Sequence, residues 1–236
     1  MKEDRWVSLF SGGKDSNWAL CQALENGLNV EYLLTVHPPA GSYMYHVPAT
    51  RVVPLVAESI GIGLIEIEPE FEIPGDVDSG EQGDKEIKCI KNSLIEMEDE
   101  INLKGIIAGA VESEYQRSRI QKMCDELDIV LYAPLWKSDP LVMINKMVET
   151  GFEIMIVSVA ADGMEESWLG RYIDNKAIVE LKAINEKYGV HILGEGGEYE
   201  TLVTNGPHMN RGVEIEYDVF WEQNWGEIRV KNAWLN

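Results

Sequence analysis

The sequence predicts a doubly wound α/β domain with a five-stranded parallel sheet in the order 3-2-1-4-5, followed by a smaller α+β domain. Three observations predict this arrangement. Five short apolar runs alternate with helical patterns in the first half of the chain, and a glycine-rich turn directly follows the first run. After Trp136 the pattern changes to longer segments with alternating apolar residues. We therefore expect one domain over 1–137 and a second over 138–236.

The strands of the first domain are predicted from runs that are short and continuously apolar, as is typical of parallel strands covered on both faces. In order, they are 6–10, 30–36, 64–67, 105–108 and 129–133. Between them, apolar residues spaced three or four apart predict helices over 17–26, 50–60, 87–101 and 120–127. The acidic stretch 68–86 holds two prolines and three glycines without periodicity. We expect a long loop there, which is either a functional lid or disordered.

The second domain is predicted from clear helix boundaries and from period-two alternation. Asp139 followed by Pro140 is a favourable helix start, and Gly151 is a favourable stop. A strand is expected over 153–160 and a helix over 172–188. Apolar residues alternate along 213–219 and again along 228–230, which predicts two strands joined by a turn at 224–226.

The segment Ser11-Gly-Gly-Lys-Asp-Ser16 lies between the first strand and the first helix. Such a turn directs backbone N–H groups and the positive end of a helix at one point, which favours phosphate binding. Lys14 would add a positive charge, and the serine hydroxyls would add donors. An ordinary strand-to-helix turn is the alternative. The spacing does not fit the Walker pattern G-x-x-x-x-G-K-[ST].

Two later strings are too polar and too rich in glycine to be core. They are Met164-Glu-Glu-Ser-Trp-Leu-Gly-Arg171 and Gly194-Glu-Gly-Gly-Glu-Tyr-Glu-Thr201. The second could surround an ammonium ion, an amine or a cation with carboxylates, or it could be an acidic turn between 190–193 and 202–204. Arg171 could bind an anionic group or form a structural salt bridge with Asp174.

Composition limits the classes of function. The chain of 236 residues carries a formal net charge of −21, which disfavours nucleic-acid binding because that binding depends on neutralising phosphates. It has no run of about 18 apolar residues, so we expect no membrane span, and 1–5 does not resemble a signal peptide. The three cysteines form no C-x-x-C, so neither a disulfide framework nor a zinc site is expected. We expect a cytoplasmic protein.

Taken together, these motifs resemble the diphthine–ammonia ligase family, a branch of the N-type ATP pyrophosphatases with the loop SGGxDS (PP-loop). The resemblance rests on Ser11–Ser16, on Ser113-Glu-Tyr-Gln-Arg-Ser-Arg119, on Leu135-Trp136, and on the two polar strings; it covers about residues 5–210. The last string is the most specific of these. The implied fold of the first domain is the HUP type, similar to the adenine nucleotide alpha hydrolases.

The resemblance also implies chemistry, cofactors and partners. ATP would adenylate the carboxylate of diphthine on elongation factor 2, pyrophosphate would leave, and ammonia would displace AMP. ATP and Mg²⁺ are the implied cofactors, and a homodimer is left open. The residues expected to bind ATP are Phe10, Ser11, Gly12, Gly13, Lys14, Asp15, Ser16, Thr35, His37, Gly109 and Ala110. Those expected to bind the substrate are Glu114, Tyr115, Arg117, Arg119, Trp168, Arg171, Gly196, Gly197, Tyr199 and Thr201.

The expected catalytic residues are Lys14 and Asp15 for the phosphates and Glu195, Glu198 or Glu200 for ammonium. Asp15 would hold Mg²⁺ or cap the following helix. Three alternatives stay open: a PP-loop ligase acting on a different small carboxylate, a non-catalytic ATP-binding module, and a tRNA modifier with a basic face.

Overall fold

The computed structural model describes residues 3–37, 50–68, 79–98 and 101–236. The chain divides into two compact units. The first consists of Met1–Ser11, Ala19–His46 and Ile62–Trp136, and the second of Gly12–Trp18, Val47–Gly61 and Lys137–Asn236. The division between Trp136 and Lys137 lies one residue before the expected boundary at 137/138. The segments 12–18 and 47–61 belong to the second unit, although they precede that boundary in sequence.

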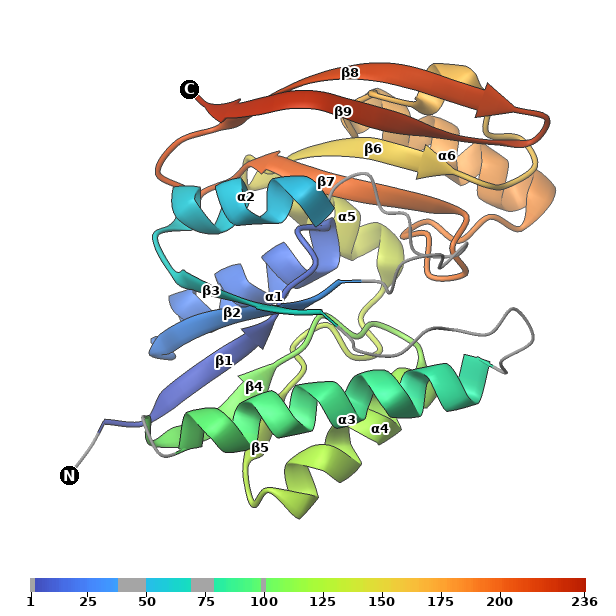
Figure 1. The fold of residues 1–236 in the computed structure, drawn as a ribbon. Helices are drawn as coiled ribbons and strands as arrows, with labels where there is room; N and C mark the ends of the chain where they lie inside the picture. The colour runs from blue at the N-terminus through green and yellow to red at the C-terminus, as the bar shows by residue number, and fades with distance from the viewer. Residues whose placement is uncertain (1–2, 38–49, 69–78, 99–100) are drawn as a thin grey trace. The chain divides into compact units, whose positions relative to one another are not determined.

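The first unit contains the predicted parallel sheet, and its strand order of β3-β2-β1-β4-β5 confirms the prediction (Figure 1). The strands are β1 (Arg5–Leu9), β2 (Val30–Val36), β3 (Gly63–Ile67), β4 (Leu103–Ile107) and β5 (Val130–Tyr132). All four pairings are parallel. Each strand lies within two residues of the run that predicted it. Because the strands are parallel, the residues that follow β1, β2 and β4 meet at one edge of the sheet.

Helices α3 (Ser79–Glu98) and α4 (Glu114–Glu126) lie together on one face of this sheet (Figure 1). Their apolar sides pack into a core with the strands, where Leu94, Ile106 and Cys124 are fully buried. Removing such side chains from water is the main favourable term in holding a sheet and its helices together.

The prediction of a loop over 68–86 is wrong for residues 79–86, because α3 begins at Ser79. Two contacts with α4 and its side chains stabilise the N-terminal part of α3. Arg119 of α4 forms an ion pair with Asp84 at 2.7 Å, and Gly83 leaves room for the ring of Tyr115. Local composition could not reveal these contacts with a helix that is distant in sequence. The rest of the predicted loop, 69–78, lies outside the described residues.

The second unit is built on an antiparallel sheet in the order β7-β6-β9-β8. Its strands are β6 (Glu153–Val159), β7 (Tyr199–Asn205), β8 (Val213–Glu222) and β9 (Trp225–Leu235). The β8–β9 turn is at Gln223 and Asn224, so the expected turn at 224–226 is right for Asn224 and wrong for Trp225 and Gly226, which begin β9. Gln223 adopts the left-handed conformation that such a tight turn requires.

The helices of this unit are α5 (Pro140–Glu149), α6 (Asn175–Tyr188) and α2 (Val53–Ile60), with short 3₁₀ segments η1 (Thr50–Val52) and η2 (Glu166–Trp168). Asp139 caps α5 as predicted, accepting a hydrogen bond from the Val142 N–H at 2.9 Å. Helix α6 begins three residues later than predicted because Asp174 caps it through the Ala177 N–H at 2.7 Å. Helix α2 packs on β8 and β9.

Helix α1 (Lys14–Glu25) is shared between the units, since its first five residues belong to the second and the remainder to the first. Among the described residues, no helix is both long and apolar enough to cross a membrane.

Candidate functional site

The glycine-rich loop lies along the free edge of strand β7, within the second unit. The Val203 N–H donates to the Gly12 carbonyl at 3.0 Å, and the Lys14 N–H donates to the Thr201 hydroxyl oxygen at 3.2 Å. Since β7 is an edge strand, its outward groups are available for this pairing. The loop is therefore held as an additional, short partner of the sheet.

Gly12 has a conformation that only glycine adopts without strain, with φ at +78°. A Cβ at this position would also lie 3.1 Å from Cγ2 of Val53 and 3.6 Å from Cδ1 of Leu202. The backbone conformation thus requires glycine where the chain enters α1, and a larger residue would also crowd the Val53 side chain.

The carbonyl of Gly13 is the point at which α1 begins. It accepts hydrogen bonds from the Asn17 N–H at 3.1 Å, from the Asn17 side-chain amide at 2.9 Å and from the Ser16 hydroxyl at 3.1 Å. Asn17 in turn accepts from Nε2 of His208 at 3.0 Å. The turn expected from SGGKDS is thus fixed by side chains within the motif and by two residues outside it.

Lys14 is buried, with 4% of its surface exposed. Its ammonium nitrogen lies 2.8 Å from Oδ2 of Asp15 and 5.5 Å from the centre of the Tyr199 ring, a cation–π distance. Burial by itself would lower the pKa of this ammonium. The attraction of Asp15, Tyr199 and Glu200, together with the hydrogen bond to Asp15, exceeds that effect and raises the pKa. Lys14 is therefore a buried, permanent positive charge.

Asp15 lies in the first turn of α1, after the residue at which the helix begins, so it does not cap the helix, which was one of the two roles expected for it. Its Oδ2 accepts from Lys14, and its Oδ1 is buried without a hydrogen-bond partner. Within the described residues, no group of three or more His, Cys, Asp or Glu could hold a metal ion. One carboxylate oxygen nevertheless suits Mg²⁺, which commonly binds through one or two carboxylates together with water and substrate phosphates.

The loop that precedes β7 is organised around the carboxylate of Glu198. One of its oxygens accepts from the His191 N–H at 2.8 Å, and the other accepts from the Gly196 N–H at 2.8 Å. Gly194, with φ at +70°, would place a Cβ 2.7 Å from the Tyr199 carbonyl, so the loop closes only over a glycine. Both carboxylate oxygens of Glu198 are therefore engaged in hydrogen bonds that hold the loop.

Tyr199 and Glu200 begin β7 beside Lys14. Tyr199 is buried and donates its hydroxyl hydrogen to the Ile192 carbonyl; burial raises the pKa of its phenol. Glu200 is exposed as a residue. Neighbouring protein nevertheless replaces part of the water around its carboxyl, which raises the pKa of that group. The attraction of Lys14 opposes this rise, while Asp15 and Glu195 add to it. The structure thus brings a cation, a carboxylate with an unpaired oxygen and a second carboxylate close together.

The remaining residues expected to bind ATP lie in the first unit, at the carboxyl edge of its sheet. Thr35 lies near the end of β2, and the others follow β1, β2 or β4. The Phe10 N–H donates to the Leu34 carbonyl at 2.8 Å, which ties the end of β1 to β2. His37 is hydrogen bonded to Glu66 at 2.6 Å, and Thr35 is buried. This group consists of Phe10, Ser11, Thr35, His37, Gly109 and Ala110.

Four of the residues expected to bind substrate lie on α4 of the first unit, where Ser113 caps the helix. The guanidinium of Arg119 lies 3.5 Å from the centre of the Tyr115 ring, and that of Arg117 lies 4.8 Å from the Trp136 ring. Glu114 is in the first turn of this helix and is exposed. Arg117 and Arg119 therefore already make contacts within their own unit.

Trp168 and Arg171, also expected to bind substrate, have internal partners in the second unit. Trp168 is buried, and the Arg171 guanidinium lies 4.4 Å from its ring. Arg171 pairs with Glu180 at 2.5 Å rather than with Asp174, whose carboxylate caps α6. A structural ion pair is thus present, with a different acid from the one considered in the sequence.

The thiols of the two buried cysteines are protonated at neutral pH. Burial raises the pKa of Cys21 to about 11 and that of Cys124 to about 12, with nearby carboxylates adding to both shifts. Cys21, Cys89 and Cys124 form no disulfide with one another. Since the thiolate is the reactive form, Cys21 and Cys124 are poor nucleophiles.

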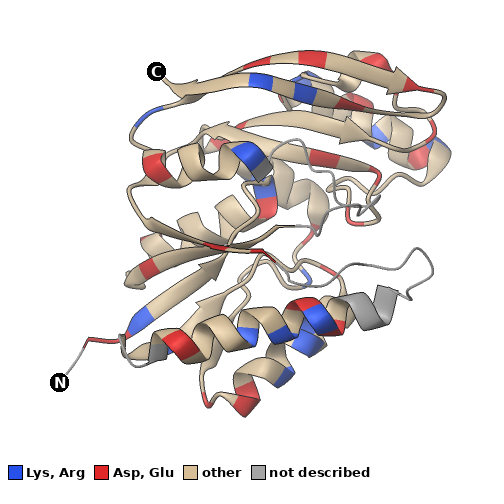
Figure 2. Cartoon of the chain, in the orientation of Figure 1, with Lys and Arg blue, Asp and Glu red and all other residues tan. Residues whose placement is uncertain are grey.

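Lys and Arg residues gather along α3 and α4 (Figure 2), but Asp and Glu residues are interspersed among them. Lys91 pairs with Glu126 at 2.7 Å, and Arg119 pairs with Asp84. These pairings reduce the positive field that a polyanion would meet on this part of the first unit.

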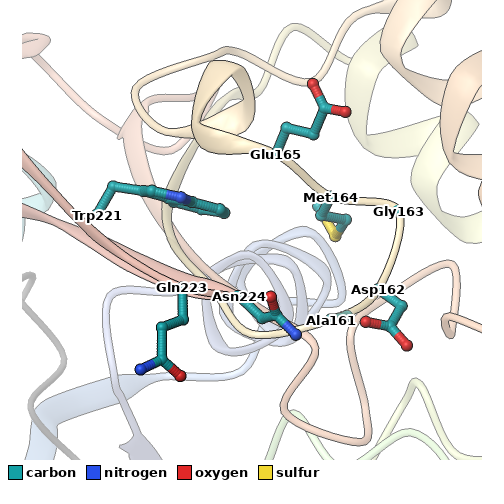
Figure 3. A pocket seen from close by; sticks show the side chains of 8 residues that line it. All are labelled: Ala161, Asp162, Gly163, Met164, Glu165, Trp221, Gln223 and Asn224. Carbon is teal, nitrogen blue, oxygen red and sulfur yellow. The ribbon is translucent and has the colours of Figure 1, made fainter.

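A hollow of about 200 Å³ lies elsewhere in the second unit, between the segment after β6 and the β8–β9 turn (Figure 3). Trp221 and Met164 face each other across it, whereas the carboxylates of Asp162 and Glu165 point away. Its lining residues are Ala161, Asp162, Gly163, Met164, Glu165, Trp221, Gln223 and Asn224. Of the two polar strings, only Met164 and Glu165 contribute to it.

Two residues that hold the glycine-rich loop, Asn17 and His208, were missed by the sequence analysis. Asn17 directly follows SGGKDS and lies in the first turn of the helix, so its position was a usable signal. His208 is 191 residues away from Asn17, and only the string Gly206-Pro-His208, a turn after a strand, marked it.

A glycine-rich turn at the end of the first strand of a doubly wound sheet, with a buried lysine in its first helical turn, is typical of α/β proteins that bind phosphate. Comparison with known proteins narrows this class. Residues 4–131 match the diphthamide synthase N-terminal domain, and residues 139–235 match the diphthamide synthase C-terminal domain. The chain therefore belongs to the diphthamide synthase family.

Curated relatives agree with this assignment. The diphthine–ammonia ligase of Danio rerio is 31% identical over 90% of this chain and 86% of its own length. That of Schizosaccharomyces pombe is 31% identical over 94% of this chain and 38% of its own length. By their names, these relatives are enzymes that form carbon–nitrogen bonds.

A solved structure described as a predicted subunit of tRNA methyltransferase from Methanocaldococcus jannaschii aligns with a TM-score of 0.43 at 16% identity, over 86% of this chain and 100% of that chain. A likeness this low decides neither fold nor function.

Proposed function

We propose that this chain is an ATP-dependent ligase that adenylates the carboxylate of diphthine on elongation factor 2 and lets ammonia displace AMP, giving diphthamide, AMP and pyrophosphate. The observation that carries the proposal is the buried ammonium of Lys14, held in the glycine-rich loop beside the carboxylates of Asp15 and Glu200. Burying an ammonium costs free energy even when it is paired, and a role in neutralising phosphate would account for a buried lysine in this loop.

In the first step, an oxygen of the substrate carboxylate attacks the α-phosphorus of ATP, and the bond from that phosphorus to the pyrophosphate oxygen breaks. A carboxylate is already ionised at neutral pH, so this step requires no general base. It does require stabilisation of the charge that develops on pyrophosphate. Lys14 supplies a positive charge for it, and one such interaction contributes about 3–4 kcal/mol in comparable sites.

Mg²⁺ fits this site through Oδ1 of Asp15, the buried oxygen without a partner. When bound, the ion would neutralise phosphate charge and orient the leaving group. The binding of the adenosine part by Thr35, His37, Gly109 and Ala110 is a proposal carried by their position at the carboxyl edge of the parallel sheet.

In the second step, the nitrogen of ammonia attacks the acyl carbon, and the bond from that carbon to the phosphate oxygen of AMP breaks. AMP leaves with the electrons of that bond, and the nitrogen releases a further proton to water as the neutral amide forms. Ammonium must first lose a proton, which requires an acceptor near the acyl group. Of the three candidate glutamates, we favour Glu200. Its carboxyl has a raised pKa and so a greater affinity for a proton, whereas both oxygens of Glu198 are engaged by backbone N–H groups. Glu195 lies close enough to raise the pKa of Glu200, and we assign it to binding the ammonium ion.

The experiment that tests this function combines the purified chain, ATP, Mg²⁺, ammonium and elongation factor 2 that carries diphthine. Pyrophosphate release that requires both the factor and ammonium, together with amide formation on the factor by mass spectrometry, is the expected result. Release with another carboxylate in place of the factor would preserve the mechanism and overturn the substrate. ATP binding without release under any of these conditions would replace the ligase with a nucleotide-binding module.

A further inference from the structure

The turn that follows β7 directs His208 back toward the glycine-rich loop. In this turn the Met209 N–H donates to the Gly206 carbonyl at 3.0 Å, and Pro207 occupies the second position, which a fixed φ favours. A Cβ on Gly206 would lie 3.2 Å from the imidazole. Glycine at this position therefore lets the ring fold against the unit.

Aromatic contacts fix the plane of the imidazole. The ring of Phe152 stacks on it with centres 5.2 Å apart and planes at 25°. Trp18 of helix α1 meets the same Phe152 edge to face at 5.3 Å. His208 is thus packed in an aromatic column that ends on the helix whose first residues form the loop.

Hydrogen bonding determines which nitrogen of His208 carries the proton. The side-chain amide nitrogen of Asn17 donates to the Gly13 carbonyl, which can only accept, so Oδ1 of Asn17 is the atom that faces Nε2 of His208. An amide oxygen also only accepts, and Nε2 must therefore donate. The other nitrogen, Nδ1, is buried without a partner, as expected of a neutral ring. Burial lowers the pKa of His208 to about 4, which keeps the ring neutral at physiological pH.

We propose that His208 is a positioning residue of the glycine-rich loop: its Nε2–H orients Asn17, and Asn17 holds the Gly13 carbonyl so that the loop keeps its phosphate-binding conformation. This inference rests on the proposed function for the role of the loop in binding ATP. The hydrogen-bonded chain itself is independent of that function. It adds a third attachment to the two that β7 makes through Thr201 and Val203.

The test compares His208→Phe with His208→Gln and Asn17→Ala. Phenylalanine keeps the stacking on Phe152 and removes the donor, whereas the amide of glutamine can still donate to Asn17. Because one neutral hydrogen bond is lost, we expect His208→Phe to raise the Kd for ATP by about 3- to 10-fold. The Kd for adenosine, which lacks phosphates, should not change. His208→Gln should recover most of the affinity, and His208→Phe combined with Asn17→Ala should bind ATP no more weakly than Asn17→Ala alone.

A readout without nucleotide separates this inference from the proposed function. In His208→Phe, the backbone amides of Lys14 and Asn17 should exchange with solvent faster than in the wild type, by about the same 3- to 10-fold. Unchanged exchange in the folded variant, or equal weakening of ATP and adenosine binding, would overturn the positioning role. If the wild-type chain bound no ATP, the proposed function would fail, and the exchange rates alone would decide whether His208 holds the loop.

Discussion

Lys14→Met replaces the buried ammonium by an apolar chain of similar length, and its effect on stability follows from the ion pair with Asp15. Removing one member of a fully buried pair costs about 3–5 kcal/mol, because the other charge is left without compensation. The Asp15 side chain retains 24% exposure and can be partly hydrated. We therefore expect a smaller loss of about 2 kcal/mol in the free energy of unfolding. Adding Asp15→Asn removes the uncompensated charge, and the double variant should regain most of that loss.

Expressed as a free energy, the loss of activity in Lys14→Met should exceed the loss of stability. The pyrophosphate leaving group would lose a buried cation in a site that excludes water, and removing one such group typically slows a reaction by about 10²- to 10³-fold. Since Lys14 stays charged well above neutral pH, this defect should be the same at every pH from 6 to 9. In contrast to stability, the rate should not recover in the double variant, because Asp15→Asn restores no positive charge.

The assays are urea unfolding for stability and single-turnover release of pyrophosphate for activity. Lys182→Met is the matched control, since it removes one positive charge from an exposed position on α6 of the same unit. It should change neither quantity measurably. A Lys14→Met enzyme that released pyrophosphate within about 3-fold of the wild-type rate would refute the assignment of this ammonium to phosphate.

Three further predictions concern the same unit. Glu200→Gln should leave pyrophosphate release within about 3-fold and slow amide formation by about 10²-fold or more, as read from separate assays of the two products; equal slowing of both would contradict the assignment to ammonium. The pKa of His208 lies near 4 in the folded protein and at 6.5 when unfolded, so its neutral form contributes stability above pH 6.5 that is lost as the pH falls toward 4. Urea unfolding should show about 2 kcal/mol less stability at pH 5 than at pH 7 from this residue, and His208→Gln should lack that part of the pH dependence. Gly12→Ala forces φ of +78° on an L-residue, and we expect a loss of about 1–2 kcal/mol in the same assay together with weaker ATP binding; an unaffected Kd for ATP would show that the loop does not require this conformation.

The parallel sheet was predictable because its strands appear in the sequence as short, continuous apolar runs, as is typical of parallel strands. The strand at 30–36 was predicted to the residue. Helix starts were predictable where the cap is local, as at Asp139. The start of α3 was not, because what extends it to Ser79 includes an ion pair with Arg119 on another helix. Short-range sequence signals cannot contain such contacts.

The candidate site divides in the same way. The loop Ser11–Ser16 and the string Gly194–Thr201 were recognisable because their residue types are unusual for a strand or a helix. What each side chain does within them was less accessible: Thr201 holds the Lys14 N–H, Glu198 holds its own loop, and Arg171 pairs with Glu180. Each of these roles depends on a geometric relation that motif spacing does not specify.

Strand β7 links the two proposed steps physically. Its outer edge supplies the hydrogen bonds that hold the phosphate-binding loop, through Thr201 and Val203. Its first residue, Tyr199, provides the ring that contacts the Lys14 ammonium. The next residue, Glu200, provides the carboxylate proposed to accept a proton from ammonium. A displacement of β7 would therefore move the groups for adenylation and for amide formation together. Such coupling would keep the groups proposed for the attack by ammonia at a fixed position relative to the groups that hold the phosphates. A reactive acyl adenylate requires this if ammonia is to react with it before water does.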